Sequence, residues 1–329
     1  MKTLAVLMSL MLLLAHVPAL AAGQIHLYGE RHGDAQMLAK ELSLWEEAYK
    51  AGQRHLFVEL PYYTAQYLNQ WMQAENDDIL DAIYCDWRGS ASHAPQVKGF
   101  YQAIKARCPE TVFHGTDVGH QYQTTGARYL AELEQQNLTD SPAYRQAQSC
   151  IQQGQAYYET GDALYREKAL VANFIAAYDA LGDAAIMGIY GSAHTEPTAA
   201  GSMAAQLQAH YGDALQCTDL TAQPLYTRRV DFMGASYTAS YFGKQDLSAY
   251  FPQYSHREFW RLEGAYEACA GLSLNGNVLP YHNYPMPVAP GQVFLVVMTL
   301  QNGSQVSEYY RSDGNTWQDQ PVTEQFLLP

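Results

Sequence analysis

Short apolar runs alternate with longer amphipathic stretches through the first two thirds of the chain. The runs are rich in β-formers, and they are Ile25–Tyr28, His55–Val58, Thr111–Phe113 and Ala185–Tyr190, with a shorter one at 214–219. The stretches between them place apolar residues at helical spacing; they cover 35–51, 62–106 with a break around Arg88–Ser90, 122–136, 142–159, 162–181 and 198–211. This alternation predicts an α/β fold, with a mostly parallel sheet flanked by helices on both faces.

The pattern changes after about residue 222. Tyrosines and β-formers now lie between frequent turn signals, such as Asn275-Gly276-Asn277. The run Val293–Met298 is typical of a strand, and the spacing over Arg257–Ala270 predicts a helix. We therefore expect an α/β domain over residues 23–221 and a smaller β-rich C-terminal domain over residues 222–329.

Residues 1–22 have the pattern of a cleavable secretory signal peptide. Lys2 precedes the apolar run Leu4–Leu14, and Pro18-Ala19-Leu20-Ala21 ends in an A-x-A cleavage pattern. No cysteine follows this region, so a lipid anchor is not expected. We expect a periplasmic or secreted protein, with a retained N-terminal anchor as the alternative. No later stretch is apolar enough to span a bilayer, which predicts no stable membrane insertion.

Composition restricts the classes of partner. The chain has 19 Lys and Arg against 33 Asp and Glu, a charge that repels the phosphates of nucleic acids and anionic lipids. Its 26 tyrosines suit a surface that binds carbohydrate, peptide or rings, although they also suit an ordinary exported protein. The five widely spaced cysteines favour one or two disulfides in an oxidising compartment. Because their number is odd, at least one thiol is expected to stay unpaired.

Ionisable residues follow four of the predicted strands. They are Glu30 with His32, Glu59, His114 with Asp117, and His194, and His120 is a further candidate nearby. Ligands of an open parallel sheet bind beyond the carboxyl ends of its strands, so these side chains are expected to meet in one pocket. Each of them alone also fits a turn, a helix cap or a surface position. Ser192 lacks a surrounding G-x-S-x-G elbow and is interpreted as structural.

The order of these motifs resembles a known superfamily. The motifs are Tyr28-Gly29-Glu30-Arg31-His32, Val58-Glu59, the stretch Tyr165–Asn173 and Gly191-Ser192-Ala193-His194. They are similar to the glutamate and histidine motifs, the arginine-bearing helix and the final Gly-x-x-His of the superfamily that joins erythromycin esterases, ChaN-like haem-binding proteins and TraB/TIKI-type proteins. Glu30 and His32 are two residues apart here, and three apart in the esterases. The resemblance covers residues 24–220.

The helix residues fit a site on physical grounds as well. Arg166 and Asn173 are seven residues apart, about two turns, and so share one helix face. From there the Arg166 guanidinium can hold Glu30 or Glu59, or a substrate carboxylate or oxyanion. A salt bridge in solvent is the alternative.

Our leading hypothesis is a hydrolase that acts on an ester, lactone or peptide bond in a small-molecule or peptide substrate. His32 would be the general base, with a carboxylate orienting it and raising its pKa above the ordinary value. His194 would be a second acid or base, and Arg166 would stabilise negative charge.

Two other chemistries stay open. Glu30, His32, Glu59 and His194 together suit a divalent metal such as zinc or manganese, because two imidazoles and one or two carboxylates leave a position for water. The ChaN-like group instead implies a haem- or iron-binding protein, in which histidine and tyrosine would ligate the iron. An inactive interaction module that keeps a relic of the site is a third interpretation.

Overall fold

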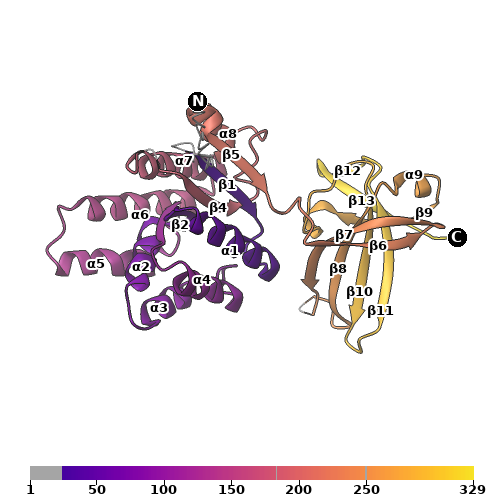
Figure 1. The fold of residues 1–329 in the computed structure, drawn as a ribbon, viewed down its shortest axis with the longest axis horizontal. Helices are drawn as coiled ribbons and strands as arrows, with labels where there is room; N and C mark the ends of the chain where they lie inside the picture. The colour runs from indigo at the N-terminus through magenta and orange to yellow at the C-terminus, as the bar shows by residue number, and fades with distance from the viewer. Residues whose placement is uncertain (1–23, 183, 249) are drawn as a thin grey trace, which may run out of the picture.

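The structure of the protein is a computed structural model that describes residues 24–182, 184–248 and 250–329. The expected signal peptide, residues 1–22, lies outside the described residues. A parallel sheet surrounded by helices is built from the first part of the chain, and a second, antiparallel sheet from the last part (Figure 1). The change from one sheet to the other falls between Asp219 and Tyr226.

The first sheet has five strands in the order β3-β2-β4-β1-β5, and every neighbouring pair is parallel. The strands are β1 (Ile25–Glu30), β2 (His55–Pro61), β3 (Val112–Asp117), β4 (Ile186–Gly191) and β5 (Leu215–Asp219). This arrangement confirms the predicted α/β class. It also places the carboxyl ends of β1, β4 and β2 next to one another at one edge.

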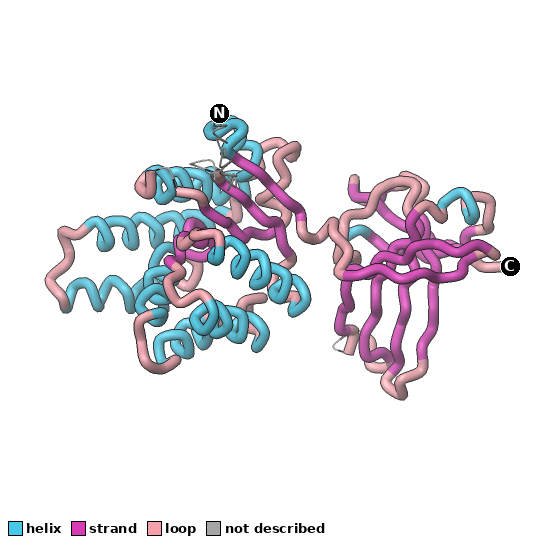
Figure 2. The backbone as a smooth tube through the Cα atoms, in the orientation of Figure 1, coloured by secondary structure: helices cyan, strands magenta, loops and turns pink. Residues whose placement is uncertain are grey.

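Helices cover both faces of this sheet (Figure 2). One core contains Leu56 and Val58 of β2, together with side chains from α1 (Ala35–Lys50), α2 (Tyr62–Met72), α3 (Asp78–Asp86), α4 (Pro95–Arg107), α5 (Ala127–Gln135) and α6 (Pro142–Thr160). The other core contains Phe57, with side chains from α7 (Ala163–Asp179) and α8 (Met203–Tyr211). Successive strand residues point to opposite faces, so an uninterrupted apolar run can supply both cores.

The second sheet has eight strands and is antiparallel. Seven of them run in the order β12-β13-β11-β10-β8-β7-β6, and β9 pairs with β13. The strands are β6 (Tyr226–Phe232), β7 (Ala235–Asp246), β8 (Tyr254–Glu263), β9 (Leu274–Pro280), β10 (Val293–Leu300), β11 (Gln305–Arg311), β12 (Thr316–Trp317) and β13 (Gln320–Phe326). The expected strand at 293–298 and the β-rich character of this part are both confirmed.

The helix predicted over Arg257–Ala270 is wrong. The first half of that stretch lies in β8, and only the four residues of α9 (Tyr266–Cys269) are helical. β8 is a central strand whose two faces are both covered: Trp260 packs into one core of the sheet, and Phe259 into the other. Apolar residues on both faces remove the alternation that marks a half-buried strand, so the pattern resembled a helix.

The expectation of one or two disulfides is also wrong, since all five cysteines are unpaired. Cys85 is exposed on α3, whereas Cys217 and Cys269 pack in or against the cores of different sheets. Cys108 and Cys150 share a core, but Cys150 directs its thiol to the carbonyl oxygen of Asp117 at 3.6 Å. The cysteines therefore serve mainly as small apolar side chains.

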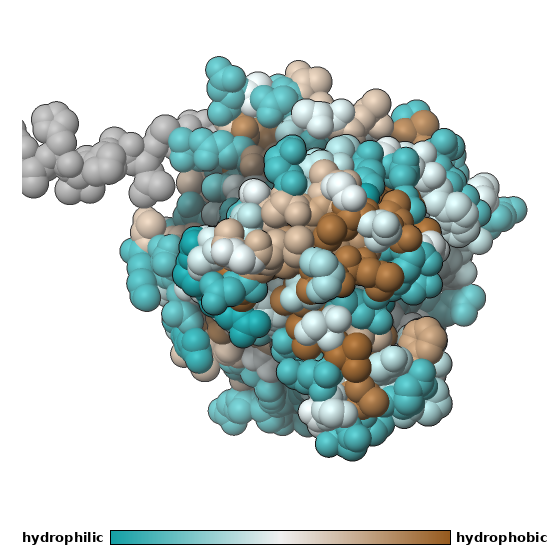
Figure 3. Space-filling view, turned by 90° about the vertical axis from the view of Figure 1, so that its right-hand side faces the viewer, coloured by the Kyte–Doolittle hydropathy of each residue, from teal (hydrophilic) through white to brown (hydrophobic). Residues whose placement is uncertain are grey.

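Some apolar side chains remain on the surface of the second sheet. Figure 3 shows brown residues among polar ones on the face of the molecule that the β-rich part presents. The large exposed apolar residues of this part include Leu274, Val278, Trp317 and Leu327. Within the described ranges, none of the helices combines the length and apolar character required to cross a membrane.

Candidate active site

The carboxyl ends of three neighbouring strands bring the predicted residues together. Glu30 is the last residue of β1, and its partner across the ladder is Gly191, the last residue of β4. Glu59 lies near the end of β2, on the other side of β4. Its Oε2 accepts a hydrogen bond from the backbone N–H of Gly191 at 2.6 Å. The strand order therefore places one buried carboxylate on each side of β4.

His32 lies between these two carboxylates. The turn after β1 directs its ring back over the sheet edge, where Nδ1 donates to Oε1 of Glu30. Nε2 lies 3.5 Å from Oε1 of Glu59. About half of the imidazole, 48 %, stays exposed, whereas both carboxylates are buried. His32 is thus held at both ring nitrogens and still faces the cavity.

Arg166 secures Glu59 from the helix side. Its Nη2 donates to Oε1 of Glu59 at 2.6 Å, and its Nε and Nη2 donate to the two oxygens of Asp117 at 3.0 and 2.5 Å. Asp117 is the last residue of β3 and is fully buried. The predicted role of Arg166 in holding a carboxylate agrees with this geometry, and a second carboxylate shares the guanidinium.

His194 contacts Glu59 from outside the lining of the cavity. Its Nε2 lies 3.3 Å from Oε1 of Glu59, and its Nδ1 hydrogen-bonds to Oε1 of Glu167 at 2.5 Å. Close packing at this point explains the glycine of the Gly-x-x-His motif. A side chain at Gly191 would place its Cβ 3.2 Å from Nε2 of His32 and 3.3 Å from Oε2 of Glu59. Only a residue without a Cβ leaves both groups undisturbed.

These contacts set the charges of the site. The hydrogen bond to Glu30, with the weaker one to Glu59, raises the pKa of His32 to about 11, the direction expected from the sequence. Burial alone would lower the pKa of His194, but its bonds to Glu167 and Glu59 raise it to about 9. Burial opposes ionisation of Glu59, yet the two imidazoles hold its pKa well below the ordinary value. Two imidazolium rings and a guanidinium therefore surround one carboxylate at neutral pH.

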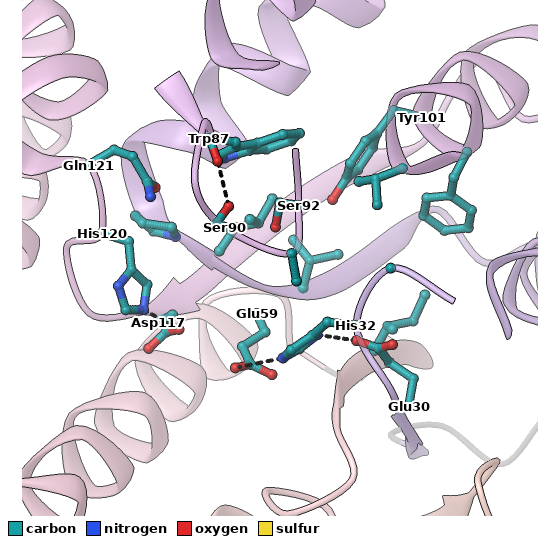
Figure 4. Close-up of a pocket in the computed structure, with 18 of the residues that line it drawn as sticks. Glu30, His32, Glu59, Trp87, Ser90, Ser92, Tyr101, Asp117, His120 and Gln121 are labelled. Atoms are coloured by element: carbon teal, nitrogen blue, oxygen red, sulfur yellow. Dashed lines mark hydrogen bonds and ion pairs between the residues drawn. The ribbon is translucent and has the colours of Figure 1, made fainter. Parts of the chain in front are cut away.

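A cavity of about 370 Å³ opens in front of this group. Glu30, His32, Glu59, Asp117 and Arg166 line it, and so does His120, whose Nε2 lies 2.9 Å from Oδ2 of Asp117. Figure 4 shows Trp87, Ser92 and Tyr101 across the cavity from the His32 ring. His194 does not line this cavity, so it acts on the site through Glu59.

Two of the secondary candidates lie elsewhere. His114 is inside β3 rather than after it, and it stacks on Phe57 on the face covered by α7. Burial, with a smaller effect of His55, lowers its pKa to about 4. Asn173 donates to the backbone carbonyl of Thr116 at 3.0 Å and thereby fixes the end of β3. Neither residue reaches the cavity.

Two acidic members of the site are not among the residues predicted from the sequence. Glu167 immediately follows Arg166 in the helix motif and orients His194. Glu41 lies on α1, is 1 % exposed and lines the cavity. Its signal in the sequence was an acid on the buried face of an amphipathic helix, three residues after Leu38 and four before Trp45.

The four expected metal ligands do not fit a metal ion as they are arranged. Oε1 of Glu59 faces both imidazoles and already accepts a hydrogen bond from Arg166. The positively charged guanidinium therefore occupies the position beside this oxygen that a divalent ion would need, and it neutralises the carboxylate charge. Within the described residues, no group of three or more His, Cys, Asp or Glu side chains is placed to hold a metal. His32 and His194 do not fit a haem iron either, because both ring nitrogens of each histidine face carboxylates.

The similarity of this chain to known proteins is one of fold. No family model matches the sequence, and no curated protein does. Among solved structures, the chain is similar to a Bacillus cereus protein at 12 % identity and a TM-score of 0.44, covering 64 % of this chain and 68 % of that one. A succinoglycan biosynthesis protein matches at 10 % identity and 0.45, covering 66 % and 70 %.

A mutant of the erythromycin esterase EreC in its open conformation matches at 11 % identity and a TM-score of 0.45, covering 73 % of this chain and 82 % of that one. The structural neighbours thus include an erythromycin esterase.

Proposed function

We propose that this chain is an exported hydrolase that cleaves an ester, lactone or peptide bond with His32 as its general base. One observation carries the proposal: a half-exposed imidazole faces a cavity while buried carboxylates hold it at both ring nitrogens. A carboxylate at Nδ1 fixes the orientation of a catalytic histidine and stabilises the imidazolium that forms when the ring accepts a proton.

The proton transfer follows from this geometry. Neutral His32 accepts a proton from a water molecule at Nε2 as the water oxygen attacks the substrate carbonyl carbon. Glu30 balances the positive charge that appears on the ring. When the intermediate collapses, the bond from carbon to the leaving oxygen or nitrogen breaks, and the same proton passes from Nε2 to the leaving group. His32 then returns to its neutral form.

Arg166 supports the reaction in two ways. It holds Glu59 beside His32 by a hydrogen bond from Nη2. Within the described part of the chain its Nη1 makes no hydrogen bond, although its Nε and Nη2 do. Nη1 can therefore face the oxyanion that forms on the substrate, where a positive charge stabilises the transition state. His194 and Glu167 act as positioning residues, because they reach the cavity only through Glu59.

The raised pKa of His32 gives this hydrolase an alkaline preference. At neutral pH most of the protein holds the imidazolium, which cannot accept another proton. The fraction of neutral base grows as the pH approaches about 11. We therefore propose activity that rises with pH through the alkaline range.

The test is hydrolysis by the purified mature protein of p-nitrophenyl acetate, δ-valerolactone and a fluorogenic peptide. His32→Gln should lower kcat/KM on the accepted substrate by about 100-fold or more, while the protein still folds. His210→Gln is the matched control, because His210 is exposed on α8 and does not line the cavity. Full activity in His32→Gln, or no hydrolysis of any of the three bond types by wild type, would refute the proposal.

Export is tested separately. The A-x-A pattern predicts that the exported protein begins near Ala22 or Gly23. N-terminal sequencing of material recovered outside the cytoplasm measures this directly. A chain that still carries Met1 would contradict a cleaved signal peptide and leave the proposed chemistry untouched.

A further inference from the structure

At one end of the cavity, two carboxyl oxygens have no hydrogen-bond partner in the part of the chain that the structure describes. Oε1 of Glu41 and Oε2 of Glu30 are both buried and have no hydrogen-bond partner in the described residues. Both side chains line the cavity, with exposed fractions of 1 % for Glu41 and 7 % for Glu30. Leaving a polar atom buried and unpaired destabilises a fold, so two such atoms in one cavity wall indicate a ligand that completes them.

Apolar and aromatic side chains also line the cavity. Trp87, Phe100 and Tyr101 contribute rings, and Leu38 and Val97 contribute aliphatic side chains. Tyr101 lies close enough to Glu41 and Glu30 that their charges help to raise its pKa, after the larger effect of burial. Carboxyl oxygens beside aromatic faces are the surroundings that recognise organic cations.

We propose that this end of the cavity binds an ammonium group, and hence that the ligand of the site is an organic amine with an apolar body. That this ligand is also the substrate rests on the hydrolase function proposed above. The ammonium donates to Glu41 Oε1 and Glu30 Oε2 and lies against the rings of Trp87 and Tyr101. The bond to be cleaved then lies toward His32.

The charges around Glu41 favour a cation over a neutral hydroxyl group. Burial raises the pKa of Glu41 well above its ordinary value, with further effects of Glu30, His32 and Asp34, of which the imidazolium acts in the opposite direction. Burial therefore disfavours the charged form of Glu41. A bound ammonium supplies the opposite charge that lets Glu41 ionise, and a hydroxyl group does not. The net charge of −14 also attracts cationic ligands to the protein.

Benzylamine and benzyl alcohol test this inference, because they share one apolar body and differ in the charge of the polar group. Their binding to the full mature chain is measured by isothermal titration calorimetry. We expect benzylamine to bind about 10-fold or more tightly than benzyl alcohol. Glu41→Gln keeps the shape of the side chain and removes its charge, and it should weaken benzylamine by about 10-fold or more while leaving benzyl alcohol unchanged.

Glu47→Gln is the matched control, since it removes one carboxylate from the exposed face of the same helix. It should leave benzylamine binding unchanged. Equal binding of the two probes to wild type would overturn the inference, even if Glu41→Gln failed to fold. Equal loss of benzylamine affinity in both variants would also overturn it, because the effect would then come from net charge. Benzylamine selectivity in a protein that hydrolyses nothing would refute the hydrolase and leave the ammonium site standing.

Discussion

Replacing Arg166 by methionine removes a guanidinium that holds two buried carboxylates. Arg166 donates three hydrogen bonds, two to Asp117 and one to Glu59, and these acceptors are 1 % and 8 % exposed. Methionine keeps most of the apolar length of the side chain. The change therefore isolates the charge and leaves two carboxylates in a buried site.

Removing one partner of a buried ion pair typically costs about 3–5 kcal/mol, because the remaining charge stays buried without compensation. The histidines next to Glu59 and Asp117 still offset part of this charge, so we expect the lower end, about 3 kcal/mol. A typical domain has a free energy of unfolding of roughly 5–15 kcal/mol, and the loss is thus a large fraction of it.

Urea denaturation followed by far-UV circular dichroism measures this loss in the α/β part, since the α-helices of the described chain lie there except for α9. The triple variant Arg166→Met, Glu59→Gln and Asp117→Asn is the control. It leaves no buried charge at this point, and most of the stability should return. A loss below about 1 kcal/mol in Arg166→Met, the value of a surface salt bridge, would refute the buried ion network.

Three further predictions concern pH, packing and positioning. Because the pKa of His32 is raised in the folded protein, the stabilisation that His32 provides is complete below pH 6.5, its ordinary pKa, and is lost as the pH rises toward about 11. Denaturation at several pH values should show stability falling over the range in which hydrolysis increases. Stability and hydrolysis that rise together would contradict the role of His32. Gly154→Ala should destabilise the protein by about 1–3 kcal/mol, because the new methyl group would meet the carbonyl oxygen of Gly119 in the loop after β3; an unchanged melting temperature would contradict this close contact. Glu167→Gln should lower the pKa of His194 from about 9 and reduce kcat with little change in KM; NMR titration of the His194 ring measures the first effect, and an unshifted ring would remove Glu167 from the positioning role.

The sequence alone predicted most of the fold. Apolar runs bounded by polar turns mark strands wherever both faces of a parallel sheet are covered, so β1, β2 and β4 were recognisable. The same rule failed in the second sheet. β8 is apolar on both faces as well, but charged residues interrupt its run, and nothing local separates such a strand from a short helix.

The candidate site was also predictable in part. Glu30, Glu59 and His194 each follow or end a strand, and the carboxyl ends of parallel strands share one edge of the sheet. His114 shows the limit of this argument, because β3 continues three residues beyond it and turns its ring to the opposite face. A strand boundary shifted by a few residues is enough to move a side chain out of the site.

Tertiary structure alone decided which charges meet. The order β3-β2-β4-β1 sets Glu59 and Glu30 on the two sides of β4, and no local pattern encodes that order. The packing of α7 against β3 then turns Arg166 toward both Glu59 and Asp117. α1 likewise buries Oε1 of Glu41 without a hydrogen-bond partner among the described residues. These outcomes depend on contacts between residues far apart in the chain, and the strength of a charge depends on what surrounds it after folding.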